Sequence, residues 1–244
     1  MSTLNSAPGW MVSEPPGGER ALPVYLLLDT SGSMRGVPIE SLTQGLEQFQ
    51  KETSDDPFAR DVVKVGLITF DSGARLLDDK LVPIAEFKIP HLVAEGWTRL
   101  DLAFLELAKS MDRDISKPKK GTNQKGDWRP MVFVLTDGYP TDENGGSSDT
   151  LWRAAREAVM KRPAGSIKPS TIVAVGCGVD VKDETLREIS TGTAFRMGSE
   201  SAAFNAFLQF VTQSVISAVQ PGSNPEQPAP NVPPPPGSVV VSNT

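Results

Sequence analysis

Continuous apolar runs alternate along the chain with segments whose apolar residues recur at helical spacing. The run VYLLLD (24–29) has no polar position before its final aspartate, which is typical of a strand buried on both faces. Residues 38–53 follow it with their apolar side chains three or four positions apart, which predicts a helix packed along one face. The folded part of the chain is therefore expected to begin with a buried strand and a covering helix.

The same alternation continues to residue 218. Residues 74–84, ARLLDDKLVPI, follow the strand at 62–70 through a tight DSG turn, which predicts an antiparallel edge strand. Further strands are expected at 131–137, 170–177 and 193–197, and helices at 100–111, 149–161, 182–190 and 200–218. Apolar strands alternating with helices predict an α/β fold, a doubly wound, mostly parallel six-stranded sheet with one antiparallel edge strand.

Both ends of the chain differ in composition from its middle. We expect residues 1–20 to be disordered, residues 21–219 to form one domain, and residues 220–244 to be a proline-rich disordered tail. The terminal VVVSNT is prone to form a strand, and we interpret it as an idle end in preference to a segment that adds to the sheet edge of a partner. On that interpretation, removing the tail leaves the melting temperature nearly unchanged.

The composition of the chain limits the classes of partner and the cellular location that we expect. The 244 residues carry a net charge of -6 and no dominant basic patch, which argues against a nucleic-acid partner. No secretory signal and no apolar run of about 18 residues is evident, so we expect a cytoplasmic protein without a membrane span.

The single cysteine, Cys177, excludes an internal disulfide, and we expect it to lie in the core. The lone His91 has no second metal-ligating neighbour and is expected at the surface.

Oxygen-bearing side chains follow two of the predicted strands. Asp29, Ser31 and Ser33 alternate in DTSGS, so they can face one side, and Asp137 ends the strand at 131–137. In a parallel sheet, ligands bind beyond the carboxyl ends of the strands. Oxygen ligands suit a hard cation such as Mg²⁺, and a set with only two carboxylates leaves positive charge on the ion for an acidic ligand. The competing interpretation of DTSGS is plain helix capping.

The set resembles the von Willebrand factor A domains, whose metal-ion-dependent adhesion site has the pattern DxSxS, then Thr, then Asp. DTSGS supplies the first part, Thr98 in EGWTRLDLAF matches the threonine, and LTDG supplies the aspartate. The resemblance covers residues 21–219. It implies a Mg²⁺ or Mn²⁺ ion that an acidic residue of a protein partner completes. The implied metal residues are Asp29, Ser31, Ser33, Thr98 and Asp137.

Within that family the chain looks most similar to tellurium-resistance TerY-like proteins. The stretches behind this are residues 23–46, 96–104 and 125–142. The resemblance implies a role in tellurite or other chemical stress, or a phosphorylation-linked complex with a kinase or phosphatase as partner. Some relatives carry a C-terminal metal-binding module, from which this chain departs by ending in its proline-rich tail.

Several residues near the predicted site are open to two interpretations. Trp97, Tyr139 and Thr141 are expected to form a partner-binding rim, although Trp97 could equally pack in the core. Asp142 is either part of the rim or a helix cap. The basic segment 113–129 is interpreted as a solvated loop, with steering of an acidic partner as the alternative.

The leading functional hypothesis is a non-enzymatic, metal-dependent protein-binding module, because no base or nucleophile accompanies the predicted ligands. The alternative is a metal-dependent phosphoesterase or a regulatory subunit of an ATPase or phosphorylation system. A third hypothesis is a structural adaptor in which the metal only stabilises the fold.

Overall fold

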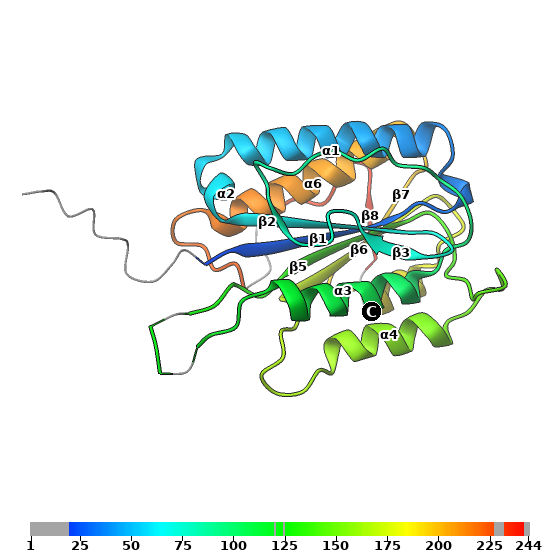
Figure 1. Cartoon of the computed structure of the whole chain (residues 1–244). Helices are drawn as coiled ribbons and strands as arrows, with labels where there is room; N and C mark the ends of the chain where they lie inside the picture. The colour runs from blue at the N-terminus through cyan, green and yellow to red at the C-terminus, as the bar shows by residue number, and fades with distance from the viewer. Residues whose placement is uncertain (1–19, 120, 124, 227–231, 242–244) are drawn as a thin grey trace, which may run out of the picture.

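A computed structural model describes residues 20–241 except 120, 124 and 227–231. An eight-stranded sheet lies between two layers of helices (Figure 1). All eight residues of the first strand are buried, as its unbroken apolar run predicts. The strands are β1 (Leu22–Asp29), β2 (Val63–Phe70), β3 (Ala74–Leu76), β4 (Val82–Pro83), β5 (Met131–Thr136), β6 (Thr171–Cys177), β7 (Ala194–Met197) and β8 (Val239–Val241).

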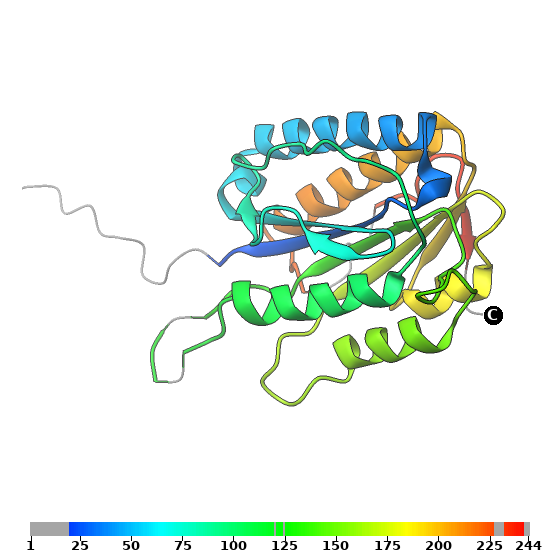
Figure 2. The same ribbon diagram turned by 45° about the vertical axis from the view of Figure 1, so that its right-hand side comes forward.

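Helices cover both faces of the sheet, as the alternating pattern predicts. Helices α1, α2 and α6 lie on one face, and α3, α4 and α5 lie on the other (Figures 1 and 2). Each layer encloses its own apolar core against the sheet. The helices are α1 (Val37–Asp55), α2 (Pro57–Val62), α3 (Leu100–Asp114), α4 (Thr150–Met160), α5 (Asp183–Ile189) and α6 (Ser201–Val219), with a 3-10 turn η1 (Gly32–Met34) after β1.

The centre of the sheet is parallel and its edges are antiparallel. The order is β3-β2-β1-β5-β6-β7-β8, and β4 pairs with β2 beside β3. The mostly parallel α/β fold is therefore confirmed, but the strand number is eight instead of six. The predicted edge strand at 74–84 is split in two, because the backbone turns at Asp79 with φ of +55°. The second additional strand, β8, comes from the C-terminal segment.

The end of the described chain differs from the idle segment expected. Val239–Val241 pairs antiparallel with β7, and Val241 is only 4% exposed. Val232, further back in the proline-rich segment, packs against the core. A strand at this position covers the backbone groups that β7 would otherwise present as an open edge, which is the physical reason for the difference. The predicted disorder of residues 1–20 falls almost wholly outside the described residues.

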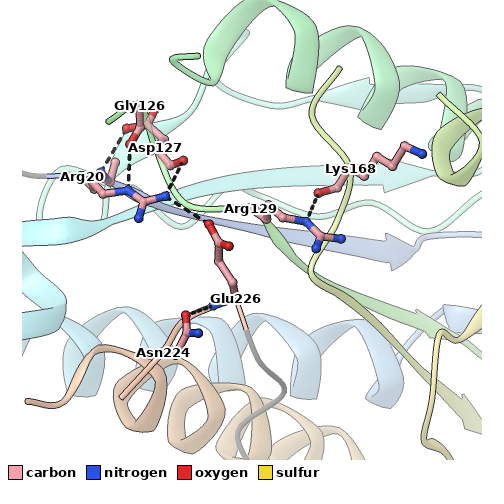
Figure 3. A network of polar contacts seen from close by, with 8 residues as sticks. Arg20, Gly126, Asp127, Arg129, Lys168, Asn224 and Glu226 are labelled. Atoms are coloured by element: carbon pink, nitrogen blue, oxygen red, sulfur yellow. Dashed lines mark hydrogen bonds and ion pairs between the residues drawn. The ribbon is translucent and has the colours of Figure 1, made fainter. Parts of the chain in front are cut away.

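A polar network around Arg20 lies at the end of the sheet where β1 begins (Figure 3). The Arg20 side chain donates to the carbonyl oxygens of Gly126 and Asp127, at 2.9 and 3.3 Å, and pairs with Glu226 at 3.1 Å. Its guanidinium also lies over the ring of Trp128. These contacts bind the start of β1 to the segment after α6.

The basic connection between α3 and β5 lies at this same end of the sheet. Asp127 accepts hydrogen bonds from the backbone N–H groups of Ala21 and Ser116, which holds both ends of residues 116–127 near the start of β1. The loop therefore projects from the edge opposite the carboxyl ends of the strands (Figure 1). Steering of a partner by a basic loop beside the predicted site is wrong, because the sheet separates the two.

Helix α6 is the one helix in the described ranges that is long and apolar enough to cross a membrane. However, 61% of its apolar window is buried within the domain. Phe210 packs edge-on against Phe133 of β5 and Phe195 of β7. Its apolar character is accounted for by its place in the core.

Candidate metal centre

The first part of the candidate site is built where β1 ends. Asp29 is fully buried, and its Oδ1 accepts a hydrogen bond of 2.9 Å from the backbone N–H of Ser31. The hydroxyls of Ser31 and Ser33 lie 3.0 Å apart, while Thr30 turns away and donates to Phe70 O of β2. The alternation in the sequence therefore places the two serine hydroxyls on one side and the intervening threonine on the other.

The second part comes from two distant loops. Ser33 Oγ donates a hydrogen bond of 2.7 Å to Oδ1 of Asp137, the residue after β5. A β-carbon added at Gly138 would lie 3.2 Å from Thr98 Oγ1 and 3.9 Å from Ser33 Oγ, so the Thr98 hydroxyl faces this same cluster. The structure thus brings together all five residues predicted as metal ligands.

Helix capping does not account for these hydroxyls. Helix α1 is preceded by Gly36, and the turn η1 is preceded by Ser31, which forms no side-chain cap hydrogen bond. Helix α3 begins after Arg99, which also forms no such bond, so Thr98 is not its capping residue. The capping interpretation of DTSGS is therefore wrong for the described structure, and the side-chain oxygens remain directed at one another.

The loop that carries Thr98 is held against η1 by backbone contacts. Gly96 O accepts a hydrogen bond of 3.1 Å from Gly32 N, and Glu95 N donates to Thr30 O at 2.9 Å. Gly96 has a φ of +73°, and a β-carbon there would lie 2.4 Å from Ser72 Oγ. Only glycine meets both the left-handed backbone and this close approach. Gly96 consequently fixes how near Thr98 comes to the serines.

A second loop, residues 138–148, is fastened to the Thr98 loop. Thr98 and Thr141 exchange hydrogen bonds: Thr98 N donates to Thr141 Oγ1 at 3.0 Å, and Thr141 N donates to Thr98 O at 2.9 Å. The Asp142 carboxylate accepts from Asn144 N and Gly146 N, which makes it a turn residue in place of a helix cap. Thr141, predicted as a rim residue, therefore belongs to the framework that positions Thr98.

The other two predicted rim residues face different surroundings. Trp97 is 49% exposed, and its indole lies against Gly145, where an added β-carbon would be 2.8 Å from three ring atoms. Tyr139 has its ring under the ammonium group of Lys182, 4.8 Å from the centroid, and its hydroxyl is hydrogen-bonded to Asp149. Of the three, Trp97 offers the largest apolar surface beside the cluster.

Thr136, the last residue of β5, is a site residue that the sequence analysis did not single out as one. Its hydroxyl donates a hydrogen bond of 2.6 Å to Asp29 Oδ2. The signal that would have identified it is a buried hydroxyl residue at the end of the strand beside β1, directly before Asp137. With Ser31 N on the other oxygen, Thr136 fixes the orientation of the Asp29 carboxylate.

Burial and neighbouring negative charge both raise the pKa values of the Asp29 and Asp137 carboxyl groups. Burial raises the pKa of Asp29 to about 7, and the nearby Asp137 carboxylate adds to the rise. The groups that favour its ionised form are hydrogen-bond donors, Thr136 and Ser31, with no arginine or lysine among them. Burial likewise raises the pKa of Asp137, helped by Asp180 and opposed by the hydrogen bond from Ser33. A cation at this edge would stabilise both ionised carboxylates.

The donor set fits a hard divalent cation. Three hydroxyls and two carboxylates converge, and oxygen ligands of this kind suit Mg²⁺ or Mn²⁺. The described ranges hold no group of three or more His, Cys, Asp or Glu side chains placed to bind a metal, so a cation here would depend on the hydroxyls. Asp29, deepest in the cluster, is suited to orient waters or hydroxyls around the ion.

Two other residues considered in the sequence stay outside this cluster. Cys177, at the end of β6, is 1% exposed, and burial raises the pKa of its thiol well above the usual range. Its predicted place in the core is confirmed. His91 is exposed in the connection between β4 and α3, as expected.

Solved structures with the same fold come from several bacteria. A von Willebrand factor type A protein from Catenulispora acidiphila matches with a TM-score of 0.60 and 15% identity, over 81% of this chain and 43% of its own. The pilus adhesin SpaC from Lactobacillus rhamnosus GG matches with a TM-score of 0.61 and 14% identity, over 84% of this chain and 32% of its own. The chain thus spans less than half the length of either protein.

A third structure matches over nearly its whole length. The vWF domain of the pilus tip protein Mfa5 from Porphyromonas gingivalis has a TM-score of 0.56 and 12% identity, over 84% of this chain and 98% of its own. A search of curated proteins found no match. The family model of the von Willebrand factor type A domain, in contrast, matches residues 24–213, which include most of β1, all of β2 to β7 and every residue of the candidate site. The chain belongs to the von Willebrand factor type A domain family.

Proposed function

We propose that the chain is a metal-dependent protein-binding module. In this proposal Asp29, Ser31, Ser33, Thr98 and Asp137 hold Mg²⁺ or Mn²⁺, and the ion takes up an acidic side chain of a protein partner. The observation that carries it is the hydrogen bond from Ser33 to Asp137, because it joins the two halves of the predicted ligand set.

The charge balance supports an acidic partner. Two carboxylates and three neutral hydroxyls around a divalent ion leave it short of anionic ligands, and Mg²⁺ requires about six oxygen ligands at near-octahedral positions. A carboxylate from outside supplies both the charge and a ligand. Trp97, half exposed beside the cluster, offers an aromatic surface of the kind enriched at protein interfaces.

The names of similar structures agree with a binding role. SpaC is described as a pilus adhesin, and PilB from Streptococcus sanguinis as a minor pilin. The proposed cellular role and partner rest on the sequence resemblance to TerY-like proteins. On that basis we propose a cytoplasmic role in tellurite or other stress resistance, with a kinase or phosphatase as the partner that offers the carboxylate.

Calorimetric titration of Mg²⁺ and Mn²⁺ into the EDTA-treated full chain tests the metal site. We expect saturable binding to the wild type and a loss of tenfold or more in affinity for Ser33→Ala and Asp137→Asn. Ser223→Ala is the matched control, because Ser223 is exposed after the end of α6 at the opposite edge of the sheet. Binding that is equal in all four proteins would show that any cation site lies elsewhere.

The acidic partner is tested separately, with the metal present. Proteins captured from a lysate in Mg²⁺ should be released by EDTA, and the Ser33→Ala chain should not capture them. The enzymatic alternative predicts turnover of generic phosphoesters with Mg²⁺ or Mn²⁺ that Asp29→Ala abolishes. Turnover of that kind would replace the binding-module proposal with a hydrolase.

A further inference from the structure

The outer edge of β7 is covered by the chain's own C-terminal strand. β8 pairs antiparallel with β7 over three residues, from Ala194 opposite Val241 to Arg196 opposite Val239. Without β8, β7 would end the sheet on this side. Its unpaired N–H and C=O groups would then form a template for another strand. The β7 edge is therefore an acceptor for an extended segment, and β8 shows which segment fits it.

The fit requires an extended, apolar, β-branched segment. Val241 is 4% exposed and joins the core cluster that contains Ala194. Val239 and Val240 are 65% and 46% exposed, so they contribute mainly backbone pairing. One buried valine and a short ladder thus define what the edge recognises.

So small an element is released more easily than the domain unfolds. Burying one valine side chain contributes only a small part of the free energy of unfolding of a whole domain. Elements at an edge with few buried contacts open locally while the remainder stays folded. An opening of this kind would expose the β7 edge.

The connection to β8 is long enough to reach another molecule. Residues 220–238 separate the end of α6 from β8, and they are rich in proline. Such a segment in an extended conformation spans about 60 Å at ~3.1 Å per residue. A folded domain of this size is about 40 Å across. Glu226 and Val232 hold parts of this connection against the domain, so the exchange must release these contacts as well.

We propose that the β7 edge is a second protein-binding surface, separate from the metal site, and that its partner is β8 of another copy of this chain. Two copies exchange β8 reciprocally and form a dimer with two-fold symmetry. Because the exchanged strand meets an identical edge in an identical register, the exchange needs no new complementarity. It becomes favourable once the concentration of copies approaches the effective concentration of the tethered strand.

The experiment uses two full-length variants, each with one new cysteine in addition to the buried native Cys177, and the two new thiols face each other across the exchanged pair. Arg196→Cys and Val239→Cys place thiols on residues that face each other in the β7–β8 register, at positions that are partly exposed. One variant carries a removable fusion so that the mixed dimer has its own mass. The two are mixed at high concentration in a glutathione buffer. The control mixture uses Val239→Cys combined with Val241→Asp, which cannot seat its buried valine.

We expect the mixed disulfide to exceed the control severalfold, and light scattering of the wild type to show a dimer that dissociates on dilution. Mixed disulfide at the control level, with monomer alone in light scattering, would overturn the proposal. A wild-type dimer without the mixed disulfide would overturn it too, because the copies would then join through another surface.

Discussion

Ser33 and Asp137 are 104 positions apart in the sequence, and the serine hydroxyl donates a hydrogen bond of 2.7 Å to the aspartate. The contact arises because β1 and β5 are parallel neighbours, so the loops after them leave the sheet at the same edge. A cation between the two residues would replace this hydrogen bond with two metal–oxygen contacts. The structure therefore brings these two proposed ligands into direct contact.

Mg²⁺ should raise the melting temperature of the wild type and not that of Asp29→Asn. An ion that binds only the folded state at a concentration of about 100 times its dissociation constant stabilises it by about 2.7 kcal/mol. Asparagine keeps the size of the buried aspartate but removes its charge. Asp61→Asn, an exposed change on α2, is the control and should respond as the wild type does. An unchanged Mg²⁺ response in Asp29→Asn would count against the site.

Gly145→Ala should destabilise the domain more than Gly165→Ala. Both glycines have positive φ, of +81° and +86°, so alanine meets the same backbone strain of about 1 kcal/mol at each. Only at Gly145 would the new β-carbon meet the Trp97 indole, since nothing lies within 4 Å at Gly165. The free energy of unfolding in urea gives both values. Equal losses would show that Trp97 does not rest on this loop in solution.

Val241→Asp should lower the melting temperature by several degrees, while Val239→Asp should leave it nearly unchanged. Val241 is 4% exposed and Val239 is 65% exposed, although both belong to β8. The loss at Val241 is about 2 kcal/mol from the lost burial, before the cost of the added charge. Calorimetry of the three full-length chains compares them. If both variants melt with the wild type, the C-terminal segment is idle after all.

Tyr25→Phe should flatten the alkaline decline in stability. Burial raises the pKa of the Tyr25 phenol well above its usual value near 10, although the hydrogen bond with Ser110 acts in the opposite direction. Because the folded-state pKa is the higher one, this stability is complete below pH 10 and is lost as the pH rises above it, at about 1.4 kcal/mol per pH unit.

The same substitution should cost about 1 kcal/mol at pH 7 through the lost hydrogen bond to Ser110. The stabilities of the wild type and the variant should therefore converge between pH 10 and pH 11. Urea unfolding at pH 7, 10 and 11 measures this difference. Curves that stay parallel would contradict a buried, protonated Tyr25.

The fold was predictable because its strands and helices carry strong local patterns. The apolar run at residues 24–29 and the helical spacing at 38–53 reappear as β1 and α1 within a few residues. The convergence of Asp29 with Asp137 followed from parallel strand ends alone. Thr98 needed the family resemblance, because its loop has no periodic pattern to place it.

Elements decided by distant contacts were not predictable in this way. Helix α2 has six residues and starts at the Asp56 cap, which is too short for a helical pattern to stand out. β8 is a strand only because β7 offers it an edge, and no local signal in Val239–Val241 names that partner. Likewise, the hydrogen bond between Thr136 and Asp29 depends on which strands are neighbours.

β1 begins beside Arg20, in the polar network at one edge of the sheet, and ends at Asp29 in the candidate site. Eight extended residues separate these edges by about 25 Å. A tether attached ahead of Arg20 would therefore leave the domain on the side away from the candidate metal centre. A sensor surface coated with the protein through an N-terminal tag would display the candidate metal centre outward, free for a soluble partner to reach.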